Sequence, residues 1–144
     1  MKNKWLFFAL GAVSAVVVML AINFFTEYKG DVRSTSGTGI TYKSVEVSAN
    51  LSADVRDYLG DGSGSRRLYF GDLPDKKEAI RITSHMCATF YVYPLDEESM
   101  LVKYEPYNGI HRTYKLTWKD NFNKLLKSLY ETTGNEVFAE EITY

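Results

Sequence analysis

The chain has 144 residues, a formal net charge of −1 and 45% hydrophobic residues. A chain of this size suits a single domain with one additional segment rather than several domains. The chain has a single cysteine, Cys87, so it cannot form an internal disulfide. The mixed charge, with no basic stripe, argues against a nucleic acid partner.

An apolar run opens the chain, from Trp5 to Phe25, and it contains no charged residue and no proline. A helix of this length would measure about 32 Å, which is enough to cross the hydrocarbon core of a bilayer. We therefore predict that residues 1–27 form a transmembrane anchor that contacts the lipid bilayer through residues 5–25.

The charges that flank the run suggest an orientation. Lys2 and Lys4 precede it, which favours an N-terminus inside and a C-terminal domain on the periplasmic or extracellular side of the inner (cytoplasmic) membrane. Lys29 and Arg33 follow it, so the charge difference is small. A cleaved signal peptide is the alternative, because residues 13–15 resemble a cleavage triplet, although cleavage there would leave an apolar tail.

Gly11 and Ala15 form a pair of small residues four positions apart within this run. Such pairs let two helices approach closely in lipid, so these two residues are candidates for a helix–helix contact in the membrane. Passive anchoring is the alternative.

Residues 28–39 are polar and rich in Gly, Ser and Thr, which predicts a flexible tether. Residues 40–144 then form the predicted exported domain. Beyond the apolar run the chain carries 15 basic and 18 acidic residues, a net charge of −3.

Several short elements are expected in the first half of this domain. Strand-forming and turn-forming residues predict a strand over 40–48, a helix over 52–59, a strand over 66–70 and a short turn or helical piece over 74–77. Strands over 79–84 and 87–93 should follow, either as two strands or merged into one bent strand.

The second half contains the clearest patterns. Asn108-Gly109 is a favoured hairpin turn, and alternating residues precede it at Met100, Val102 and Tyr104. After the turn, Arg112 interrupts an otherwise apolar strand face made of Ile110, Tyr114, Leu116 and Trp118.

An amphipathic helix should follow, since apolar residues recur at helical spacing and Gly134 stands just past the last of them. The face consists of Phe122, Leu125, Leu126, Leu129 and Tyr130. Residues 136–144 are expected to form a last strand. The predicted fold class is α+β: an N-terminal single transmembrane helix followed by a small antiparallel sheet domain with one amphipathic helix packed on it.

No motif in the chain carries convincing catalytic or metal-binding chemistry. The glycine-rich segment 61–72 has the wrong residues for a calcium loop and the wrong spacing for a phosphate loop. His85, Cys87 and His111 could supply three zinc ligands, but the chain has only two histidines, one at the start of a strand and one beside a turn, which favours a structural role. We therefore expect no catalytic residue, no metal and no cofactor.

The aromatic content points instead to binding. All eleven tyrosines follow the apolar run, and Tyr and Arg are enriched at protein interfaces. We take Arg66, Arg67, Tyr69 and Tyr107 as partner-contact residues, and expect the loss of Arg67 and Tyr69 together to leave the fold stable.

These patterns predict a single-pass, membrane-anchored envelope protein, not an enzyme, whose extracytoplasmic domain binds another protein. It would serve as a subunit of an envelope complex, or as a tethered inhibitor or immunity protein. The alternatives are a membrane-tethered sensor domain for a small ligand and, third, a hydrolase.

Overall fold

The computed structural model describes residues 2–26, 38–50, 65–84, 88–117 and 122–144. The chain divides into two compact units, Met1–Gly30 and Asp31–Tyr144. The first contains helix α1 (Lys2–Thr26), and the second contains the α+β domain.

Helix α1 is a candidate membrane span by length and composition. Its stretch from Asn3 to Ile22 is strongly apolar, and none of the side chains there is buried. A signal sequence near the N-terminus would meet the same criteria.

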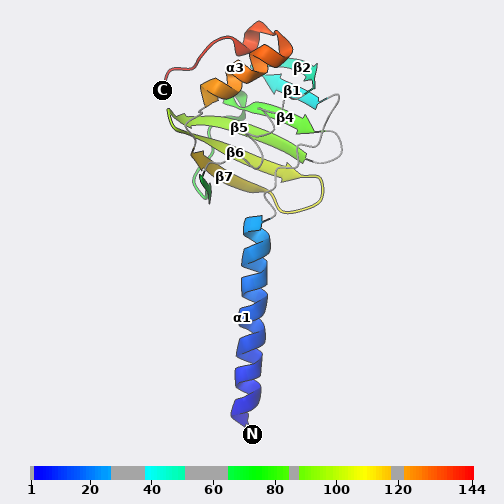
Figure 1. Cartoon of the computed structure of the whole chain (residues 1–144), viewed down its shortest axis with the longest axis vertical. Helices are drawn as coiled ribbons and strands as arrows, with labels where there is room; N and C mark the ends of the chain where they lie inside the picture. The colour runs from blue at the N-terminus through cyan, green and yellow to red at the C-terminus, as the bar shows by residue number, and fades with distance from the viewer. Residues whose placement is uncertain (1, 27–37, 51–64, 85–87, 118–121) are drawn as a thin grey trace. The chain divides into compact units, whose positions relative to one another are not determined.

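The domain is built on one antiparallel sheet of seven strands (Figure 1), in the order β2-β1-β4-β5-β6-β7-β3. The strands are β1 (Thr38–Tyr42), β2 (Val45–Ala49), β3 (Ser65–Leu68), β4 (Ile80–Ser84), β5 (Ala88–Asp96), β6 (Ser99–Pro106) and β7 (Arg112–Thr117). A 3-10 turn, η1 (Lys76–Glu78), precedes β4, and helix α3 (Phe122–Thr133) and the 3-10 turn η2 (Glu136–Phe138) follow β7. The predicted fold class is confirmed.

The single strand predicted over 40–48 is wrong, because β1 and β2 form a hairpin there. Lys43 and Ser44 make the turn, with φ angles of 46° and 66°. Positive φ at both central residues is typical of a type I′ turn, which usually contains Asn or Gly. The sequence therefore lacked the Asn or Gly by which a hairpin turn of this type is recognised. Strand β1 also begins at Thr38, so Thr38 and Gly39 belong to the sheet and not to the tether.

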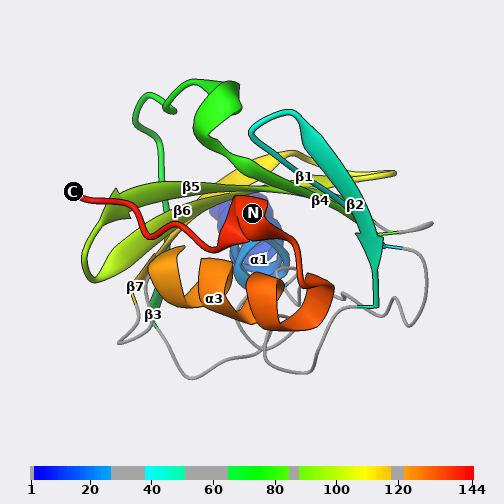
Figure 2. The same ribbon diagram turned by 90° about the horizontal axis from the view of Figure 1, so that it is seen from above.

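One face of the sheet, here called the inner face, is covered by α3 (Figure 2). The alternation predicted for these strands places their apolar residues on this face. Its buried core consists of Ile40, Tyr42, Ile80, Ile82, Phe90, Val92, Met100, Val102, Tyr114, Leu116, Phe122, Leu125, Leu126, Leu129 and Phe138. The helix face predicted from the sequence is the one that packs, except that Tyr130 is 37% exposed.

The opposite face, the outer face, is partly covered by the segment that joins β3 to β4 (Figure 2). Ala79, Tyr93 and Leu101 form a small buried cluster there, and Tyr69, Leu73, Tyr91 and Leu95 pack against it. The rest of the outer face carries half-buried and exposed polar side chains.

The strand predicted over 136–144 is also wrong. Gly134, with φ 64°, ends α3, and the Asn135 side chain accepts a hydrogen bond from the Val137 amide at 3.0 Å. The resulting turn η2 buries Phe138, whose ring stacks on Tyr42 at 5.9 Å between centroids. Local capping therefore holds this segment against the helix and the core rather than in the sheet.

One further prediction around β7 fails, because Ile110 lies in the loop before β7 and is 64% exposed. Arg112 lies on the predicted face with Tyr114 and Leu116, and it is buried there with only 8% exposure. Trp118 and the helix predicted over 52–59 lie outside the described residues.

Candidate functional site

The predicted contact residues do not form one surface. Arg67 is exposed on the outer face of β3, at the edge of the sheet, where it pairs with Lys115. Tyr107 is 84% exposed in the loop between β6 and β7. The side chain of Arg66 lies outside the described residues, although its backbone pairs with Leu116.

Tyr69 has a structural position. Its ring packs against the cluster of Ala79, Tyr93 and Leu101, and its hydroxyl donates to the Asp72 carbonyl oxygen at 3.2 Å. The expectation that Tyr69 can be removed at no cost to stability is therefore corrected, because its loss would uncover part of this cluster.

The outer face instead centres on Tyr91. The backbone register places six residues in one row across the sheet, namely Glu46, Thr41, Arg81, Tyr91, Lys103 and Thr113. Tyr91 thus has a cationic side chain on each neighbouring strand. These residues face outward because their neighbours in sequence, such as Ile80, Ile82 and Val92, fill the core.

A third cation reaches Tyr91 from η1. The ammonium of Lys76 lies 5.1 Å from the centroid of the Tyr91 ring, and that of Lys103 lies 5.8 Å from it. Both distances fall within the range of a cation–π interaction. Since the ring is already fixed by these contacts, it would lose little conformational freedom on meeting a partner.

We call Lys76, Arg81, Tyr91 and Lys103 the Tyr91 surface. Lys76 and Arg81 form no ion pair with any residue that the structure describes, and both are exposed. Lys103 pairs with Glu105. The surface therefore carries more positive than negative charge, which favours contact with carboxylates.

The Lys103–Glu105 pair is partly buried, and it changes the ionisation of the carboxyl group. Desolvation alone would raise the pKa of Glu105, but the hydrogen bond and charge of Lys103, and then His111, outweigh it and lower the pKa below its ordinary value. The His111 Nδ1 lies 3.8 Å from the carboxylate. Lys103 is thereby held in place beside Tyr91.

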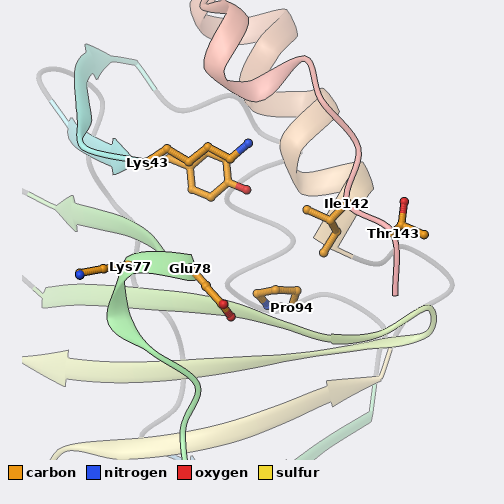
Figure 3. A pocket seen from close by; sticks show the side chains of 7 residues that line it. Lys43, Lys77, Glu78, Pro94, Ile142 and Thr143 are labelled. Carbon is orange, nitrogen blue, oxygen red and sulfur yellow. The ribbon is translucent and has the colours of Figure 1, made fainter.

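A cavity of about 470 Å³ lies at a different place, beside the β1–β2 turn (Figure 3), and it is lined by Tyr42, Lys43, Lys77, Glu78, Pro94, Ile142 and Thr143. In Figure 3 Glu78 extends toward Pro94, whereas Lys77 extends away from the other side chains. Lys43 donates to Glu140 at 3.0 Å. This hydrogen bond raises the pKa of Lys43, and burial raises the pKa of Tyr42.

Within the described ranges, no three His, Cys, Asp or Glu side chains gather in a way that could hold a metal ion. His111 is exposed beside Glu105, while His85 and Cys87 lie outside those ranges. The structure therefore does not test whether His85, Cys87 and His111 could bind zinc together.

The sequence did contain a signal for the Tyr91 surface. In Ile80-Arg81-Ile82 and Phe90-Tyr91-Val92 a cation and a tyrosine each stand between two apolar residues. This alternation predicts outward side chains. Only the pairing of β4 with β5 shows that Arg81 and Tyr91 lie on the same face of the sheet, on adjacent strands.

The membrane contact predicted at Gly11 and Ala15 stays a prediction. Both residues lie on α1, and a Cβ atom added at Gly11 would meet no atom within 4 Å. A larger side chain is therefore compatible with the helix itself.

Comparison of the chain with models of protein families, with curated proteins and with solved structures found no match.

Proposed function

We propose that this protein is a single-pass, membrane-anchored envelope protein whose α+β domain binds another protein on the outer side of the inner membrane. Helix α1 supplies the anchor, and the Tyr91 surface supplies the contact. The role would be that of an envelope-complex subunit or of a tethered inhibitor or immunity protein.

The observation that carries the proposal is the position of the half-buried Tyr91 among three cationic side chains on the outer face of the sheet. Tyr and Arg are the residue types that most often dominate the energy of protein interfaces. Arg81 can bind a carboxylate through two parallel hydrogen bonds, so the partner is expected to present Asp or Glu side chains. Arg67 lies on the same face and would extend this contact.

The proposal can be tested by photo-crosslinking in the native membrane. A photoreactive amino acid at Arg81 of the full chain should give one discrete product with a second protein, and Tyr91→Ala should remove it. The matched control is the same amino acid at Lys127, which is exposed on α3 and lies away from the sheet's outer face. Equal products from both positions, or a product that survives Tyr91→Ala, would contradict the proposal.

A second candidate function, a tethered sensor for a small ligand, draws on the cavity beside Tyr42. Its volume lies within the range of small-molecule sites, and it combines apolar walls with a carboxylate and hydroxyl groups. Pro94→Trp would narrow the cavity without touching Tyr91. If this variant abolishes function while Tyr91→Ala does not, the sensor function replaces protein binding.

A further inference from the structure

Three large apolar side chains are exposed near one end of the sheet. Phe70 is 88% exposed, Tyr107 is 84% exposed and Ile110 is 64% exposed. Tyr107 and Ile110 belong to the loop between β6 and β7. Phe70 lies beside the start of β7, because the amide of the preceding Tyr69 donates to the Thr113 carbonyl at 2.9 Å. We call these three residues the apolar tip.

The apolar tip lies at the end of the sheet where the chain enters the domain. Gly39, the second residue of β1, pairs with Thr83 near the end of β4, and the pairs Ser84–Ala88, Ala88–Pro106 and Tyr104–Arg112 lead across the sheet to the β6–β7 loop. Figure 1 shows β4 and β6 running toward this end. The start of β1 and the tip therefore share one end.

A short covalent link joins α1 to the strand that begins at this end of the sheet. Residues 27–37 separate the end of α1 at Thr26 from the start of β1 at Thr38. Eleven residues span at most about 40 Å even when fully extended. If α1 crosses a bilayer, the start of β1 lies within about 40 Å of the same membrane.

Charge is distributed unequally between the two ends. Residues 106–110 and 69–71 carry no charged side chain, although Glu105 and Asp72 stand directly beside them. The opposite end carries Lys43 in the β1–β2 turn, Lys76, Lys77 and Glu78 in η1, and Glu97 and Glu98 in the β5–β6 turn. Tyr and Phe are favoured at the membrane interface, whereas the carboxylates of the opposite end are repelled by anionic headgroups.

We propose that the apolar tip inserts into the interface of the bilayer that α1 spans, so that the domain is held against the membrane by its β6–β7 end. This inference rests on the membrane anchor of the proposed function. The anchor makes insertion of the tip an intramolecular event, so three side chains suffice where they would be too weak alone. The Tyr91 surface would then be presented beside the membrane in a restricted orientation.

The test uses the full chain reconstituted in phosphatidylcholine–phosphatidylglycerol vesicles, in a Cys87→Ala background. Asn108→Cys places an environment-sensitive dye in the β6–β7 loop between Tyr107 and Ile110, and Glu98→Cys places it at the opposite end of the sheet. Lipids with a nitroxide near the headgroup should quench the dye at position 108 several-fold more strongly than at position 98. Both positions are exposed, so labelling should leave the fold intact.

A second comparison isolates the three side chains. Replacing Phe70, Tyr107 and Ile110 together by Ser should reduce quenching at position 108 to the level at position 98. Equal quenching at both positions, or no effect of the Ser replacements, overturns the inference. The inference is also overturned if the dye at position 108 is shielded only when other membrane proteins are present. That result would mean that the apolar tip binds a protein and not the lipid.

Failure of the two proposals is distinguishable. Loss of tip quenching with the Arg81 crosslink intact overturns membrane insertion alone. A full chain that fails to float with the vesicles overturns the anchor, and insertion of the tip with it.

Discussion

The side-chain amide of Asn123 in α3 binds both backbone groups of Ile142. Its Oδ1 accepts from the Ile142 amide at 2.8 Å, and its Nδ2 donates to the Ile142 carbonyl at 3.0 Å. These two bonds fix the C-terminal segment beside the helix, where Ile142 and Thr143 help to line the cavity shown in Figure 3.

We expect Asn123→Ala to lower the free energy of unfolding by about 2 kcal/mol, because it leaves two partly buried backbone groups without their partners. Thermal unfolding of the full chain in detergent measures this. Lys127→Ala, at an exposed position of the same helix, is the control and should leave the melting temperature nearly unchanged. Similar melting temperatures for both variants would show that the segment is not held by Asn123.

Leu126→Asp should unfold the domain. Leu126 is 1% exposed in the core between α3 and the sheet, so the variant would bury a carboxylate without a partner at a cost of about 4 kcal/mol or more. Near-ultraviolet circular dichroism of the full chain would report the loss of packing. Lys127→Asp adds the same charge one position away at the surface, and a matching loss there would contradict the assignment of the buried face.

The Lys103–Glu105 pair should make stability depend on pH in the acid range. The pKa of Glu105 is lower in the folded state than its ordinary value of 4.5, so the pair contributes stability above that pH. This contribution is lost as the pH falls from about 5 through the lowered folded pKa. Glu105→Gln should therefore flatten the dependence of the unfolding free energy on pH below 5, and Lys103→Met should do the same. An unchanged acid slope in both variants would contradict the pairing.

Gly71→Ala should destabilise the segment that joins β3 to β4. A Cβ atom at this position would overlap the hydroxyl oxygen of Tyr69 and lie 2.6 Å from its Cζ. The ring would have to move off the cluster of Ala79, Tyr93 and Leu101, at a cost of about 1–3 kcal/mol. In a Tyr69→Ala background the same glycine substitution should cost much less. If the effects of Gly71→Ala and Tyr69→Ala on the free energy of unfolding are strictly additive, the Tyr69 ring does not contact Gly71.

Gly11→Ile tests association within the membrane. If Gly11 and Ala15 form a helix–helix contact, the larger side chain should separate the helices and abolish their crosslinking in lipid. Val13→Ile, on the opposite side of α1, is the control and should have no effect. Insertion into the membrane should be the same for both variants. Equal crosslinking in both would leave α1 as a passive anchor.

The local patterns of the chain determined several elements. The apolar run defined α1, and the spacing of Phe122, Leu125 and Leu126 identified the face of α3 that packs on the sheet. Such periodicities follow from the geometry of one element and need no knowledge of its neighbours. The two strands around 79–93 and the short helical piece before them were also correct.

Other features were decided only by tertiary contacts. Lys43 and Ser44 adopt a turn that neither residue favours, because β1 and β2 pair along their whole length as an antiparallel hairpin. The C-terminal segment leaves the sheet because Asn123 binds it and Phe138 fills a place beside Tyr42. In the same way, Arg81, Tyr91 and Lys103 became one surface only through the register of three strands. The sequence by itself therefore determined the apolar helix α1 and the packing face of α3, which depend on spacing along the chain, whereas the Tyr91 surface and the apolar tip depend on which distant segments pair.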